Sequence, residues 1–98
     1  MSNVNIKFFR PHVIPGVTAV YGIDAIDPET IVSSGTSQVT TSGAPDHNVF
    51  CRVASSGGDV WISIGASPTA VSGEGTLILD GIPEIFKLES GDKIAVID

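Results

Sequence analysis

The sequence predicts an all-β fold, and three observations lead to that prediction. Eleven Gly and six Pro stand among many Val, Ile, Ser and Thr residues, which is typical of short strands joined by tight turns. Apolar and polar residues alternate along several segments of the second half. No long segment has the composition of a helix. Because a single open sheet would leave its apolar face in water, we expect a small two-sheet sandwich, jelly-roll-like, or a small barrel.

The length of 98 residues allows one hydrophobic core, so residues 1–98 are predicted to form a single domain. The first segment, residues 5–10, is a candidate strand. Pro11 and Pro15 follow it, and proline lacks a backbone donor and is confined to the edges of sheets. We therefore expect residues 1–16 to form a peripheral arm.

The next part of the chain predicts one strand and one turn. Residues 17–21 combine β-branched and aromatic side chains before Gly22, which fits a strand. Residues 24–30 have turn chemistry, in which Asp27 caps at most one helical turn that begins at Pro28.

Two polar segments, residues 30–33 and 36–41, flank Ser34 and Gly35. They are expected to form a pair of partly exposed strands. Residues 42–47 have the composition of a loop.

From residue 48 onward the alternation is clear. Val49, Cys51 and Val53 share one face of a predicted strand, which stops at the Ser and Gly residues of positions 55–58. The same pattern recurs over residues 59–64, so the two strands are predicted to form a hairpin.

The last third of the chain continues as loops and strands. Residues 65–75 are predicted to form a long loop. Residues 76–79 and 84–88 are expected to form a second hairpin-like pair. Residues 93–97 lack alternation, which is typical of a strand buried on both sides.

The composition argues against several classes of function. Five basic and eleven acidic residues give a formal net charge of −6, and nucleic-acid binding depends on Lys and Arg, so no nucleic-acid partner is expected. Cys51 is the only cysteine, so no intrachain disulfide can form and folding in the cytoplasm is expected. No signal sequence and no stretch as long as a membrane span is present, so no membrane contact is expected.

The residues suited to catalysis or metal binding favour structural roles. Cys51 with His47 is the only local pair of nucleophile and base, but the apolar neighbours of Cys51 favour a buried, unreactive thiol. The acidic residues that come closest to forming a metal site are Asp24, Asp27 and Glu29, with Asp46 as a possible fourth. Their spacing matches no calcium loop, and it favours carboxylates that cap backbone amides or face solvent. His12 and His47 are too few and too far apart for zinc. We therefore predict no enzyme, and no catalytic, cofactor-binding or metal-binding residues.

A sandwich that binds sugars would use exposed aromatic rings. The chain holds barely enough aromatic residues for a core, so most are assigned to the core or to a subunit contact. They are Phe8, Phe9, Tyr21, Phe50, Trp61 and Phe86.

Three segments of the second half carry a resemblance to a known group of proteins. They are residues 59–70 (DVWISIGASPTA), 81–86 (GIPEIF) and 91–97 (GDKIAVI). This order of a V-W strand with a Pro-Thr loop, a Gly-x-Pro turn and a closing strand resembles small structural proteins encoded among bacteriophage head and tail genes. The resemblance covers roughly the C-terminal half of the chain.

The resemblance implies a virion component, either a capsid decoration or another head- or tail-associated protein, made in the cytoplasm of a bacterial host. It would act by assembly with capsid or tail protein and with itself, and a trimer is the first expectation for the homo-oligomer. The alternative is a carbohydrate- or receptor-binding β-sandwich module of a phage tail, which Trp61 would serve.

Overall fold

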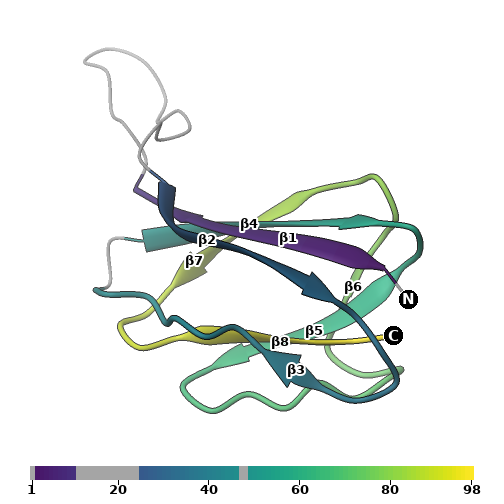
Figure 1. The fold of residues 1–98 in the computed structure, drawn as a ribbon. Coiled ribbons are helices and arrows are strands. Elements are labelled where there is room, and N and C mark those ends of the chain that lie inside the picture. The colour runs from purple at the N-terminus through teal and green to yellow at the C-terminus, as the bar shows by residue number, and fades with distance from the viewer. Residues whose placement is uncertain (1, 11–24, 47–48) are drawn as a thin grey trace.

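The computed structural model describes residues 2–10, 25–46 and 49–98, with no account of the side chains of residues 25–27. These residues form two antiparallel four-stranded sheets that face each other (Figure 1). The first sheet has the order β2-β1-β4-β7 and comprises β1 (Asn3–Phe9), β2 (Ala25–Val32), β4 (Val49–Ser56) and β7 (Glu84–Leu88). The second has the order β3-β8-β5-β6 and comprises β3 (Gln38–Val39), β5 (Val60–Gly65), β6 (Thr76–Ile78) and β8 (Lys93–Ile97). The predicted all-β two-sheet sandwich is confirmed.

The strand order is that of a jelly roll. From β2 to β8, successive strands cross from one sheet to the other at every step except β5 to β6, which pair within the second sheet. An eight-strand roll that began at β2 would place its final strand beside β2. Here β1, the first strand of the chain, occupies that place between β2 and β4.

The strands are those that the sequence predicts from residue 48 onward, but both predicted hairpins are wrong. β4 and β5 lie in opposite sheets, and so do β6 and β7. The two polar strands around Ser34 and Gly35 also separate, into β2 and β3. Each connection crosses from one sheet to the other, which places the apolar faces of the two flanking strands on opposite sides of the same core.

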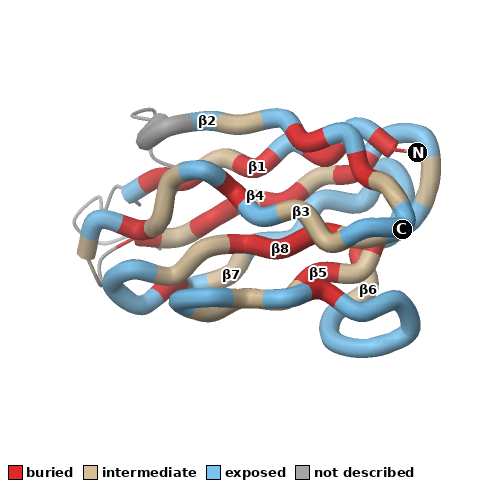
Figure 2. The backbone as a smooth tube through the Cα atoms, turned by 60° about the horizontal axis from the view of Figure 1, so that its bottom comes forward, coloured by how far each residue is buried: buried red, intermediate tan, exposed pale blue. Residues whose placement is uncertain are grey.

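The core lies between the sheets, where inward-facing side chains of both sheets meet. Figure 2 shows buried residues along strands of both sheets, among them β1, β4, β5 and β8. Burial alternates along β1 and β4, as expected of strands with one face on the core. The largest side chains that are fully buried include Phe8, Ile6, Ile62, Ile78, Leu88 and Ile94. In β8, Ile94, Ala95 and Val96 are all buried, which confirms the strand predicted to be buried on both sides.

The prediction of a peripheral arm over residues 1–16 is wrong for residues 3–9. β1 is an inner strand that pairs with β2 on one side and β4 on the other. Val4, Ile6 and Phe8 are buried at the centre of the core. Pro11 and Pro15 lie outside the described residues, as does the strand predicted for residues 17–21.

The predicted turn over residues 24–30 is also wrong from Ala25 onward, because this segment belongs to β2. Pro28 lies in an edge strand, where the pairing register shifts between Ile6 and Phe8 of β1. Edges and bulges are the positions in a sheet that tolerate a missing N–H. The Asp27-Pro28 pair therefore fits a strand bulge as well as a helix start.

Ser33 joins both ends of the described chain just after β2. It is fully buried, and its Oγ accepts a hydrogen bond of 2.9 Å from the Ser2 N–H. The same hydroxyl donates to the carboxylate of Asp98, which follows β8. Figure 1 shows the two ends of the chain side by side; we call this side of the sandwich the terminal end.

Candidate functional site

Cys51 lies on β4 with its side chain in the core, as the sequence predicts. It pairs with Phe8 of β1 and Phe86 of β7, and it is fully buried. Burial raises the pKa of the thiol to about 12, so the nucleophilic thiolate is not formed near neutral pH. His47, the proposed base, lies outside the described residues.

The carboxylates considered for a metal site do not converge where they are described. Glu29 caps the edge of the sandwich by accepting hydrogen bonds of 2.9 and 3.3 Å from the Thr41 N–H. Asp46 pairs with Arg10 at 2.6 Å. Asp24 and the side chain of Asp27 lie outside the described part. Within the described ranges, no group of three His, Cys, Asp or Glu side chains could hold a metal ion.

The aromatic residues divide between the core and the outer faces. Phe8 and Phe86 pack in or against the core. Phe9 and Phe50 stack across β1 and β4 with ring centroids 6.0 Å apart. Trp61 of β5 is half-buried and pairs with Leu77 and Ile97 on neighbouring strands. Tyr21 lies outside the described residues.

A small hollow of about 150 Å³ lies beside β5 on the second sheet. Its lining consists of Ser63, Thr69, Val71, Glu74 and Gly75. It holds one carboxylate, that of Glu74, and two hydroxyl groups, those of Ser63 and Thr69. The hollow therefore offers hydrogen-bonding groups.

The outer face of the first sheet gathers three of the five basic residues, which sequence reasoning missed because the grouping depends on strand register. Lys7 of β1 lies directly opposite Arg52 of β4, and Arg52 lies opposite Ile85 of β7. Two residues further along each strand, on the same face, Phe50 lies opposite Lys87, whose Nζ is 5.7 Å from the centroid of the Phe50 ring. Opposed residues share a face of the sheet. We call these five residues the basic face.

The loop between β6 and β7 projects apolar and acidic side chains into solvent. Leu79 and Ile82 are 43% and 54% exposed, and Asp80 and Glu84 stand beside them. We call these four residues the acidic tip. Asp80-Gly81 and Pro83 are the sequence signals of this turn.

Backbone contacts hold the acidic tip in place. The Gly81 N–H donates to the Ser55 carbonyl at 2.9 Å, and the Ile82 N–H donates to the Leu79 carbonyl at 3.1 Å. The Asp80 carboxylate accepts a hydrogen bond of 3.2 Å from the Gly57 N–H. Ile82 is thus held in water by a fixed loop, and an apolar side chain held this way is suited to a protein contact.

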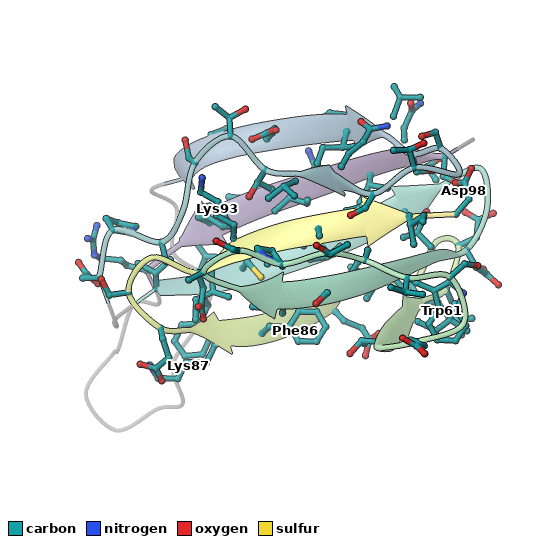
Figure 3. All side chains as sticks on the ribbon, turned by 90° about the horizontal axis from the view of Figure 1, so that it is seen from below. Trp61, Phe86, Lys87, Lys93 and Asp98 are labelled. Atoms are coloured by element: carbon teal, nitrogen blue, oxygen red, sulfur yellow. The ribbon has the colours of Figure 1, made fainter. Side chains whose placement is uncertain are left out.

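Charge is distributed unevenly along the sandwich. Asp59, Asp80, Glu84 and Asp98 lie at the terminal end, because they precede or follow the strand ends that meet there. Lys87 and Lys93 lie toward the opposite end, as Figure 3 shows. The opposite end also holds Glu89 and Asp92 in the turn before β8, so carboxylates and lysines balance there, whereas the terminal end carries the four carboxylates named above.

Two further kinds of evidence were sought for the function: membrane-spanning helices and similarity to known proteins. No helix in the described residues is long and apolar enough to cross a membrane. Comparisons with protein-family models, curated proteins and solved structures give no match, so the function is inferred from the sequence pattern and the geometry of these surfaces.

Proposed function

We propose that this chain is a non-enzymatic structural protein of a bacteriophage virion, a capsid decoration or head-associated protein that acts by assembly. It docks on capsid or tail protein and on copies of itself. The observation that carries the proposal is the acidic tip, where a fixed loop presents Leu79 and Ile82 to solvent. Covering such side chains on association removes apolar surface from water.

Two further observations support this function. The segments that resemble phage head and tail proteins form β5 with its following loop, the tip with β7, and β8. They therefore lie on both sheets and include Ile82 and Glu84 of the acidic tip. The jelly-roll strand order occurs in viral capsid domains, although it also occurs in lectins and enzymes, so it supports the proposal only as fold-level analogy.

The proposal is tested in virions purified from a phage that encodes the chain. Mass spectrometry should detect the protein in a fixed ratio to the major capsid or tail protein. The Ile82→Asp variant should fold but be depleted from virions, because a charge in a covered apolar contact is costly. Val71→Asp, at a comparably exposed position on the loop beside β5, should be incorporated normally. A protein absent from wild-type virions contradicts the proposal.

A second candidate function is carbohydrate or receptor binding at the tail. Trp61 and Ser63 share the outer face of β5, and the hollow adds the hydroxyl of Thr69 and the carboxylate of Glu74. A half-exposed indole beside hydroxyl and carboxylate groups suits a sugar ring. A glycan array probed with the wild type and with Trp61→Ala tests this candidate. It is rejected if no glycan binds, or if Trp61→Ala binds equally well.

A further inference from the structure

The basic face contains a like-charge pair directly across two strands. Lys7 and Arg52 lie opposite each other, and like charges in that position destabilise a sheet. Neither side chain makes an ion pair with a described residue, although the chain holds more than twice as many acidic as basic residues. An anionic group placed over the two cations would offset their repulsion.

The basic face also has apolar surface beside its cations. The Phe50 ring lies next to Arg52 along β4, and Ile85 lies across from Arg52 on the edge strand β7. Ile85 is exposed and Phe50 is partly exposed. A complementary partner therefore needs carboxylates and apolar side chains close together.

The acidic tip has both features in one short segment, which is the loop after β6 and the first residue of β7. Asp80 and Glu84 flank Ile82, and the terminal end around them carries two further carboxylates, Asp59 and Asp98. The carboxylates of the tip are thus opposite in charge to the cations of the basic face, and both surfaces carry exposed apolar side chains.

We propose that the basic face of one copy binds the acidic tip of a second copy of this chain. The inference rests on the proposed function and deepens it by naming the partner and both surfaces of the self-contact. Glu84 of the tip directly precedes Ile85 of the basic face, so the two surfaces adjoin. A two-fold axis would pair each face with the other copy's tip in a dimer, whereas a heterologous contact closes as a ring when the rotation per copy allows. A trimer, the first expectation for the homo-oligomer, is one such ring.

Light scattering after size exclusion tests the contact. At about 50 mM salt the wild type should elute as a defined multiple of the 10.1 kDa chain, and at about 500 mM salt it should dissociate, because salt screens exposed charges. Arg52→Glu combined with Lys7→Glu should raise the dissociation constant at least about tenfold. Lys93→Glu reverses a charge on the other sheet and should leave association unchanged.

A mixing experiment separates the contact from a general effect of net charge. Asp80→Lys combined with Glu84→Lys makes the tip basic, and this variant alone should be monomeric. Mixed with the Lys7→Glu, Arg52→Glu variant, it should form a mixed oligomer, because the reversed face then meets the reversed tip. Asp80 caps a backbone N–H, so Glu84→Lys alone serves as the tip variant if the double change does not fold.

The apolar part of the contact has its own matched pair. Ile82→Ser should weaken association, whereas Val71→Ser, at a similarly exposed position in the loop between β5 and β6, should not. A wild type that is monomeric at every salt concentration, or a mixture that does not associate, overturns the inference. Detection of that same protein in virions would still support the proposed function, with a different acidic protein on the basic face.

Discussion

Ser33→Ala should destabilise the protein more than an average serine substitution, because Ser33 holds both ends of the described chain. Its Oγ accepts the Ser2 N–H, and Ser2 is itself buried, so the variant leaves a buried donor without a partner. An unsatisfied buried polar group costs about 1–3 kcal/mol. The Asp98 carboxylate also loses its donor but is exposed and regains water. We expect a loss of about 2 kcal/mol in the free energy of unfolding.

Urea unfolding followed by circular dichroism measures this loss, and a thermal melt should show a decrease of about 8–16 °C in Tm. Ser56→Ala, at an exposed position at the end of β4, is the matched control and should change the free energy of unfolding by less than about 0.5 kcal/mol. Asp98→Ala keeps the Ser2 bond and should cost less than Ser33→Ala. Equal stabilities for Ser33→Ala and Ser56→Ala would refute the reasoning.

Three further predictions concern the core, one loop and the first strand. The Cys51 thiol should not react with a thiol reagent at pH 8 until the protein is unfolded. Its pKa is raised from 9.0 to about 12, so the thiol ionises at a lower pH in the unfolded state than in the folded state. The free energy of unfolding should therefore fall as the pH rises between those values. In urea titrations at alkaline pH, Cys51→Val should show a smaller fall. Gly75→Ala should lower Tm more than Gly73→Ala: both have φ of +87°, but only at Gly75 would the Cβ lie 2.6 Å from the Ile62 carbonyl oxygen. Val4→Asp places a carboxylate in the core and should abolish the cooperative unfolding transition, whereas a peripheral arm would tolerate this substitution. Asn3→Asp, at an exposed position, is the control and should leave the transition intact.

Strand positions could be predicted from sequence where one face of the strand is buried and the other is not. Val49, Cys51 and Val53 give this signal in β4, and the unbroken apolar run of β8 gives the signal of a strand buried on both faces. Pairing could not be predicted in the same way. The turn after Ser56 fits a hairpin and a crossing between sheets equally, and the choice depends on how distant strands share the core.

In the first third of the chain, the predictions based on proline were wrong. Pro28 fits the first turn of a helix and also an edge-strand bulge, and only pairing with β1 decides between them. The basic face was missed for a related reason. Lys7 and Arg52 are far apart in sequence, and they become neighbours only through the register of β1 with β4. The fate of Cys51 was predictable because it depends on its own strand alone.

The position of β1 also sets the order in which the chain can fold. β1 is synthesised first, yet its partners are β2 and β4, so its ladder is complete only when Ser56 is available to pair with Asn3. Until then Val4, Ile6 and Phe8 have no core to enter. Contacts between residues so distant in sequence slow folding. We therefore expect the first sheet to close only after β4 is synthesised, when β4 pairs with β1.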